Sequence, residues 1–395
     1  MYPILKLKAG KEANIIFRHP WIFSGALAEI PDDIAHGSLV HVVDSGEVII
    51  ATGTYSAKSM IAVRVFEFGR AVIDKDWFRA RFTEADALRT ILGYGSSGST
   101  SGYRLVFGES DRIPGLIVDR YEDVFVIQLA TAGLEQLREM IIEALVDLFR
   151  PRSIVERSDI SVRREEGLEE ITALRYGSDP GRVEFRENGL RFVADVNFGQ
   201  KTGFYLDQKE LRKEIREHAQ GRVILNLFSY TGAASAAALA GGAKSVLNID
   251  SSEPSLELCG VHAEMNDIPP GLSATESGDV FGWLSTRYNP EYDMVMMDPP
   301  ALIKSQVDID VGRKAYHFLN RAAMRLIKDG GLLVTSSCSA FFREEDFTYS
   351  LRRASVQAGV RLDLLKMVRQ SPDHPISLYF PESYYLKSFI CRVRR

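Results

Sequence analysis

An alternation of strand and helix patterns beyond Gly221 restricts the fold of this chain more than any other feature of its sequence. Short apolar segments at 223–227, 245–249, 292–297 and 331–337 are predicted as strands, and helical patterns follow most of them. Strands and helices that alternate in this way form a parallel sheet with helices on both faces. The sequence therefore predicts a doubly wound α/β domain, whose ligand binds beyond the carboxyl ends of the strands.

The first 72 residues have a different pattern. Apolar and β-branched segments at 38–43, 48–55 and 61–66 are separated by turn residues, which is typical of short β-strands. Residues 1–72 are therefore predicted to form a small β-barrel.

Residues 73–182 are predicted to form a central α+β domain that opens with a helix near Asp74. Its other predicted elements are strands at 103–107, 116–119, 124–130 and 153–156 and one helix at 134–149. A polar stretch, 159–179, is predicted to separate this domain from the third one, 183–395. The third domain begins with a hairpin around Asn188-Gly189, a strong turn signal.

The composition excludes several classes of protein. The 395 residues include 48 Lys or Arg and 53 Asp or Glu, so any RNA contact must come from local patches rather than from a general basic excess. Only three cysteines are present, which argues against a disulfide framework and for a reducing compartment. The longest run of small and apolar residues, 231–243, is too short to cross a membrane. We therefore expect a cytoplasmic protein without a membrane segment.

Candidate ligand-binding residues follow the first two predicted strands of the last domain. The loop after the first strand consists of Phe228, Ser229, Tyr230, Thr231 and Gly232. It is small enough for a ligand to approach the backbone, but it is not a GxGxxG motif, so a dinucleotide fits poorly. Asp250 ends the second strand, where an acid can accept hydrogen bonds from both ribose hydroxyls of an adenosine. The alternative is that Asp250 caps the next helix, as Ser251 or Ser252 could also do.

Two further groups follow the later strands. In Asp298-Pro299-Pro300 the two prolines make the backbone at the strand end rigid, which suits a surface that positions a flat base. The alternative is that the motif only ends the strand. Cys338 follows the strand predicted at 331–337. If this strand is the sheet neighbour of the strand at 292–297, the two strand ends should lie about 5 Å apart. This position favours a nucleophile over a core cysteine, whereas Cys259 and Cys391 are predicted to be core residues. Asp279, at a turn, is predicted to lie beside an adenine or to serve only in the turn.

Several motifs occur in a fixed order along the chain. They are LKAGK at 7–11, RHPWIFSG at 18–25, LVFGESD at 105–111, PGLIVDRY at 114–121, KTGFYLDQ at 201–208, LNLFSYTG at 225–232, DPP at 298–300, SSCS at 336–339, DHP at 373–375 and YYLK at 384–387. Through these motifs nearly the whole chain resembles the RlmI-type class I S-adenosylmethionine-dependent methyltransferases of large-subunit ribosomal RNA. The resemblance implies a Rossmann-like methyltransferase domain preceded by a PUA-like barrel and a central α+β domain.

The resemblance also implies roles for individual residues toward S-adenosylmethionine. The loop 228–232 would bind the methionine side, Asp250 the ribose, and Asp279 would lie by the adenine. Residues from the preceding segment would cover the cofactor: Gln200, Thr202, Phe204 and Tyr205. The remaining residues expected at the cofactor are Asn226, Ser251, Asp298 and Pro299. No metal is expected.

By the same resemblance Cys338 would be the nucleophile for methylation of cytosine C5 in 23S ribosomal RNA, with Asp298 stabilising the attacked ring. Ala301 stands where many other RNA cytosine-C5 methyltransferases carry a second cysteine, so the base that removes the C5 proton is unidentified. The alternatives are a uracil-C5 enzyme, an N-methylating enzyme such as a guanine-N7 methyltransferase, and a non-enzymatic ribosome-assembly factor.

RNA contacts are predicted in the barrel at Lys8, Lys11, Arg18 and Trp21, because cations suit phosphates and rings suit unpaired bases. The alternative for Trp21 and for Phe23 is a place in the barrel core. Ribosomal RNA is the expected partner, and a homodimer is left open.

Overall fold

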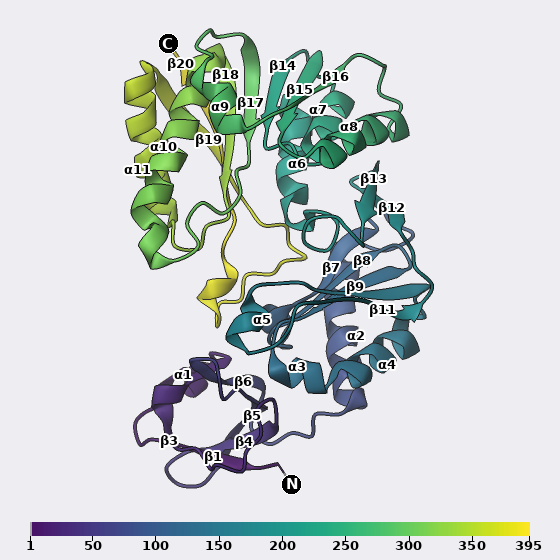
Figure 1. Ribbon diagram of the computed structural model, residues 1–395, viewed down its shortest axis with the longest axis vertical. Coiled ribbons are helices and arrows are strands. Elements are labelled where there is room, and N and C mark those ends of the chain that lie inside the picture. The colour runs from purple at the N-terminus through teal and green to yellow at the C-terminus, as the bar shows by residue number, and fades with distance from the viewer. Residues whose placement is uncertain (1) are drawn as a thin grey trace. The chain divides into compact units, whose positions relative to one another are not determined.

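The computed structural model describes residues 2–395, which divide into two compact units (Figure 1). The first unit comprises residues 2–186, 194–206 and 372–383, and the second comprises 187–193, 207–371 and 384–395. The chain therefore passes between the units several times, and each unit has its own sheets and its own hydrophobic cores.

The first unit begins with a six-stranded sheet in the order β2-β6-β5-β4-β1-β3, which curls into a small barrel (Figure 1). Its elements are β1 (Ile4–Leu7), α1 (Ala13–Ile16), β2 (Trp21–Phe23), β3 (Leu27–Glu29), β4 (Leu39–Val43), β5 (Ile49–Tyr55) and β6 (Ile61–Phe68). Leu5, Val40, Val42 and Val63 are fully buried inside it. The three strands predicted from residue 38 onward are therefore confirmed. The predicted boundary at residue 72 falls between β6 and the next helix.

A five-stranded sheet in the order β11-β10-β9-β8-β7 follows in the same unit. Its elements are α2 (Lys75–Ile91), β7 (Gly102–Phe107), β8 (Leu116–Tyr121), β9 (Val124–Leu129), α3 (Ala132–Gln136), α4 (Arg138–Phe149), β10 (Ser153–Ser158), α5 (Val162–Glu165) and β11 (Ile171–Gly177). Apolar residues of α2, α3 and α4 pack on it, and Phe78, Phe82 and Leu145 are fully buried there.

Two predictions for this region were wrong. The single helix expected at 134–149 is two helices, because the backbone of Leu137 leaves the helical region between them. The polar stretch expected to be a separator contains β11, which pairs with β10 at the edge of the sheet. Its polarity has a structural cause, since Arg175 of β11 pairs with the fully buried Glu156 of β10 at 2.7 Å. The expected hairpin is confirmed as β12 (Arg182–Glu187) and β13 (Leu190–Asp195).

A fully buried cation ties the segment 372–383 into the first unit. Arg89 of α2 donates to both carboxylate oxygens of Asp111, at 2.6 and 2.8 Å, and to the carbonyl oxygen of Asp373 at 2.7 Å. The Arg89 side chain is 0% exposed and that of Asp111 is 6% exposed. A buried charge of this kind is stable only while its partners satisfy it.

The second unit contains a seven-stranded sheet in the order β16-β15-β14-β17-β18-β20-β19 (Figure 1). Its elements are α6 (Lys209–His218), β14 (Val223–Leu227), α7 (Ala233–Ala240), β15 (Ser245–Asp250), α8 (Glu253–Met265), β16 (Ser273–Ser277), α9 (Val280–Ser285), β17 (Tyr292–Met297), α10 (Ile309–Leu326), β18 (Ile327–Ser337), α11 (Glu344–Ala358), β19 (Arg361–Arg369) and β20 (Lys387–Arg394). The strands from β16 to β18 are parallel, and β20 runs antiparallel to both of its neighbours.

Helices cover both faces of this sheet. One core joins the strands to α9, α10 and α11, and a second core joins them to α6 and α7. The predicted doubly wound domain is thus confirmed. The sequence did not indicate β16 and β19, the two edge strands.

Replacing Arg89 by alanine should destabilise the first unit by about 3–5 kcal/mol, because Asp111 would keep a buried charge without its partner. The measurement is urea unfolding of the full chain. Arg152→Ala is the matched control, since its pair with Asp123 is exposed on both sides and should contribute less than about 0.5 kcal/mol. Equal midpoints for the two variants would contradict the role given to Arg89.

Candidate active site

The sheet of the second unit brings the candidate loops to one edge. Leu227, the last residue of β14, lies opposite Ile249 of β15 on one side and Met297 of β17 on the other. Met297 in turn lies opposite Thr335 of β18, so β17 and β18 are neighbours as expected. The residues that follow these strands therefore emerge next to one another.

The loop after β14 has an unusual backbone. Phe228 and Tyr230 both have positive φ values, 57° and 47°, which side chains other than glycine adopt at a cost. Gly232, with φ 70°, precedes α7, and a Cβ there would lie 2.6 Å from the sulfur of Cys259. Glycine is thus required by space as well as by conformation. Such strained positions persist where the surroundings determine them, and they cluster at ligand sites.

The same loop presents buried polar groups. The hydroxyl oxygens of Ser229 and Thr231 are buried and have no hydrogen-bond partner among the described residues. An unsatisfied buried hydroxyl costs free energy, so two of them in one loop indicate a polar ligand.

Asp250 lies at the end of β15 and joins two loops. Its Oδ2 accepts a hydrogen bond from the Tyr230 amide at 2.8 Å, and its Oδ1 accepts one from the Ser252 amide at 3.0 Å. The cap of α8 is Ser252, whose side chain accepts from the Ser255 amide, so the capping alternative for Asp250 was wrong. Ser251 is exposed beside it.

Asp279 precedes α9 and caps it, because its Oδ2 accepts from the Gly282 amide at 2.7 Å. The adjacent Gly278 amide donates to the carbonyl of Asp250 at 3.0 Å, which brings this turn beside the end of β15. Asp279 therefore has a structural role and a position next to the ribose candidate. Its role toward the adenine stays a prediction.

Asp298 follows β17 in a half-buried position, and Pro299 after it is buried. Burial and, to a smaller extent, the nearby Asp207 raise the pKa of Asp298 to about 6, against the opposing effects of a hydrogen bond from Gln208 and the charge of Arg212. The Nε2 of Gln208 donates to Oδ2 of Asp298 at 2.5 Å. Near pH 6 this carboxyl group can therefore both hold and release a proton.

Cys338 is half-buried and follows β18 directly. The serines on either side of it are held by Tyr316 of α10, whose hydroxyl is 2.9 Å from Ser337 Oγ and 3.0 Å from Ser339 Oγ. Cys259 and Cys391 are buried in the core, as predicted, and burial raises the pKa of each thiol to about 12. Cys338 is thus the cysteine that lies at the strand ends.

The other predicted cofactor residues belong to the first unit or lie within β14. Gln200, Thr202, Phe204 and Tyr205 belong to the first unit, where the buried Thr202 hydroxyl donates to Asp119 at 2.6 Å and Tyr205 donates to Gln200 at 2.7 Å. Asn226 lies within β14, where its side-chain amide donates to Ser235 and Asn248 in a buried network. Their contacts to a cofactor stay predictions.

Among the predicted RNA-binding residues, Lys8, Lys11 and Arg18 are exposed on the barrel. Trp21 is half-buried: its indole nitrogen donates to Glu109 at 2.8 Å and its ring contacts Phe380. Phe23 is 41% exposed, so its placement in the barrel core was wrong. The three cations are therefore available to a phosphate backbone.

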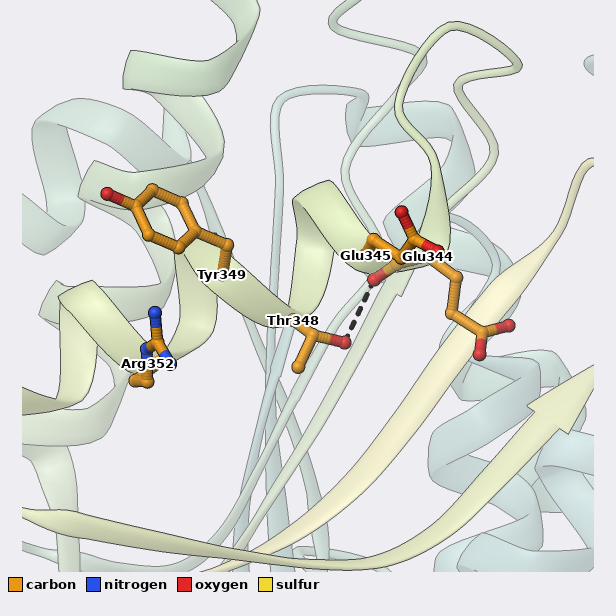
Figure 2. Close-up of a pocket in the computed structure, with 5 residues that line it drawn as sticks. All are labelled: Glu344, Glu345, Thr348, Tyr349 and Arg352. Carbon is orange, nitrogen blue, oxygen red and sulfur yellow. Dashed lines mark hydrogen bonds between the residues drawn. The ribbon is translucent and has the colours of Figure 1, made fainter.

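Sequence reasoning did not single out Glu344 and Lys387, which interact electrostatically with each other, Lys387 also with Cys338. Glu344 at the start of α11 accepts a hydrogen bond from the Tyr384 hydroxyl at 2.8 Å and lines an open pocket of about 350 Å³ (Figure 2). The other residues that line it are Glu345, Thr348, Tyr349 and Arg352. Lys387 of β20 is also near the cysteine, and its place in the YYLK motif was its only signal.

Comparison with known proteins agrees with this geometry. Residues 5–68 match a PUA-like domain family, and residues 175–371 match an S-adenosylmethionine-dependent methyltransferase family. The chain is 36% identical to ribosomal RNA large subunit methyltransferase I of Vibrio parahaemolyticus, over 100% of both chains, and 37% identical to that of Yersinia pestis, over 98% and 99%. The chain belongs to the ribosomal RNA large subunit methyltransferase I family.

Solved structures show the same fold. A putative S-adenosylmethionine-dependent methyltransferase from Streptococcus mutans has a TM-score of 0.84 at 23% identity, covering 99% of this chain and 100% of its own. A putative methyltransferase complexed with SAH has a TM-score of 0.85 at the same identity and coverage. Within residues 2–395, no helix has the length and apolar character needed to span a bilayer.

The cofactor of this methyltransferase family is S-adenosylmethionine, which supplies a methyl group bound to a positively charged sulfur. The residues at the strand ends fit it. The unsatisfied hydroxyls of Ser229 and Thr231 would hydrogen-bond polar groups of the cofactor, and the Asp250 carboxylate would accept from its ribose hydroxyls.

Replacing Asp250 by alanine should weaken S-adenosylmethionine binding by about 1–3 kcal/mol, because the ribose hydroxyls would lose their acceptor. Titration calorimetry measures the change, and circular dichroism checks the fold. Asp250→Asn keeps the shape of the side chain and an acceptor for one of the two loop amides, so it tests the loss of the charge with part of the loop geometry retained. Asp310→Ala, on the exposed start of α10, is the control for a lost charge. Unchanged affinity in Asp250→Ala would limit Asp250 to loop structure.

A pH dependence of stability follows from the raised pKa of Asp298. The folded protein binds a proton at Asp298 up to about pH 6, above the ordinary 3.8, so wild-type stability should fall as pH rises through this window. Asp298→Asn does not lose stability in this way. The Tm of the variant minus that of the wild type should therefore increase between pH 4 and pH 7.5. Asp267→Asn, exposed after α8, is the control for an Asp-to-Asn replacement. A constant difference for Asp298→Asn would contradict the raised pKa.

Proposed function

We propose that this protein methylates C5 of a cytosine in large-subunit (23S) ribosomal RNA, with S-adenosylmethionine as methyl donor and Cys338 as nucleophile. The observation that carries the proposal is the position of Cys338. It follows β18, the neighbour of the strand β17 that precedes Asp298, at the same sheet edge as the loop 228–232. Relatives that carry the name of a large-subunit ribosomal RNA methyltransferase over their full length support the choice of substrate.

A thiol at this edge answers a specific chemical need. Carbon 5 of cytosine is a weak nucleophile, but attack of the Cys338 sulfur on C6 breaks the aromaticity and gives C5 the character of an enamine carbon. C5 can then take the methyl group, a base removes the C5 proton, and the C6–S bond breaks to release the thiolate. Covalent catalysis of this kind divides one difficult step into easier ones.

Asp298 has the protonation behaviour that this sequence needs. With a pKa of about 6, its carboxyl group exchanges a proton near neutral pH, so it can share a proton with N3 of the ring while C6 is attacked. The Gln208 side chain donates a hydrogen bond to one of its oxygens and thereby fixes the orientation of the carboxyl group.

The barrel supplies the second part of the proposal. Lys8, Lys11 and Arg18 would contact phosphates, while the chemistry takes place in the domain that begins near residue 183 and the central domain, 73–182, connects the two. A ribosomal RNA substrate in turn implies a cytoplasmic location.

Cys338→Ala should abolish methyl transfer and leave S-adenosylmethionine affinity within a few-fold, because the thiol acts on the base and not on the cofactor. The measurement is mass spectrometry of nucleosides from a large-subunit RNA fragment after incubation with enzyme and cofactor. Cys391→Ala, which removes a buried core thiol, is the matched control and should retain activity.

The modified nucleoside decides among the alternatives. 5-Methylcytidine supports the proposal, and 5-methyluridine would replace cytosine by uracil with the same thiol chemistry. An N-methylated product, or full activity in Cys338→Ala, would contradict the covalent mechanism. No product from the wild type, with the cofactor bound, would favour a ribosome-assembly factor.

A further inference from the structure

We propose that the ammonium group of Lys387 holds Cys338 in its thiolate form, which makes Lys387 the positioning residue that prepares the nucleophile. The inference rests on the proposed function, because it assumes that Cys338 attacks the base.

Strand register places Lys387 beside the cysteine. Lys387 is the first residue of β20 and pairs with Ser337, the last residue of β18, in the antiparallel ladder. Its Nζ donates to the carbonyl oxygen of Ser339 at 2.9 Å. Lys387 therefore contacts the residues immediately before and after Cys338, by strand pairing with Ser337 and by a hydrogen bond to Ser339. Its charged group lies at the loop that carries the thiol.

Because Lys387 is buried, its positive charge requires a compensating anion nearby. Lys387 is 4% exposed, and a buried ammonium group is costly unless a negative charge compensates it. Burial lowers the pKa of Lys387 to about 8, while negative charge at Cys338 and Glu344 acts in the opposite direction. At pH 7 the lysine is therefore still largely protonated.

The other charged and titratable groups around it are already engaged. Glu344 of α11 accepts from the Tyr384 hydroxyl and lies 4.0 Å from Arg369 of β19, whose guanidinium stacks on the Tyr384 ring. Tyr316 of α10 stays neutral, because burial raises the pKa of its hydroxyl and negative charge at Cys338 raises it further. A thiolate at Cys338 is thus the anion that matches the Lys387 ammonium.

The consequence is a nucleophile that is ready at neutral pH. An ordinary thiol has a pKa of about 8.5, so only a few per cent is thiolate at pH 7, and a neighbouring lysine increases that fraction. The thiol proton goes to solvent before the RNA base is attacked, and Lys387 keeps its own proton. No oxidation or reduction takes place.

The test measures the pH dependence of Cys338 alkylation by iodoacetamide in the full chain without RNA, with peptide mass spectrometry to identify the site. Cys259 and Cys391 are buried and serve as slow internal references. In Lys387→Met the alkylation midpoint should rise by about one pH unit or more, which is roughly a tenfold slower reaction at pH 7. Lys387→Arg should retain most of the wild-type behaviour, and Lys366→Met, on the exposed side of β19, should match the wild type.

A second variant tests the same idea without removing the lysine. Glu344→Gln keeps an acceptor for Tyr384 but removes the competing negative charge, so the Cys338 midpoint should fall below that of the wild type. Circular dichroism and S-adenosylmethionine binding check that each variant is folded. A midpoint that neither Lys387→Met nor Glu344→Gln changes, or a wild-type Cys338 that is unreactive below pH 9, would overturn the inference.

These outcomes are distinct from failure of the proposed function. If Cys338→Ala retains activity while Lys387→Met still raises the alkylation midpoint, the pair exists but the covalent mechanism is wrong. If Cys338→Ala is inactive and the midpoint is unchanged, Cys338 is the nucleophile and Lys387 does not activate it.

Discussion

Parallel pairing of β14 with β15 and β17 is the constraint on which the candidate site depends. All three strands end at the same edge, so a chain that folds into this sheet must place the loop 228–232, Asp250 and Asp298 side by side. The site therefore results from backbone hydrogen bonding and from the apolar strands that drive it. Because this framework is rigid, the loop after β14 can hold Phe228 and Tyr230 at positive φ, a cost that a mobile loop would relax.

The antiparallel strand β20 adds what the parallel strands cannot. It enters between β18 and β19 and brings a lysine from the end of the chain against residues 337–339. A parallel neighbour would end at the same edge and would offer another loop, whereas an antiparallel one begins there and offers its first residue. This topology explains how a buried cation comes to lie next to the cysteine, and the contact joins residues 48 positions apart.

The sequence predicted the buried parts of the structure well and the exposed edges poorly. The interior strands of the second sheet are apolar, so they could be recognised in the sequence: β14, β15, β17 and β18. Three of the strands that were missed, β11, β16 and β19, each lie at the edge of a sheet and are largely exposed, so nothing in their composition required burial. Among the site residues, Asp250, Asp298 and Cys338 could be placed because they lie at the ends of strands that the apolar pattern predicts. Gln208 and Lys387 could not, because their positions depend on long-range register that local patterns do not contain.

The two groups proposed to act on the base are in opposite electrostatic surroundings at one sheet edge. Burial and the neighbouring Asp207 raise the pKa of the Asp298 carboxyl and favour its protonated form, while a buried ammonium lies beside the loop of Cys338. Surroundings that shift the pKa values of two titratable groups in opposite directions suit the groups to different tasks at the same pH. On this argument the carboxyl group is suited to exchange a proton with the ring and the thiol is suited to attack it. Exchanging their surroundings would leave a charged carboxylate with no proton to share with N3 and a protonated thiol unable to attack C6.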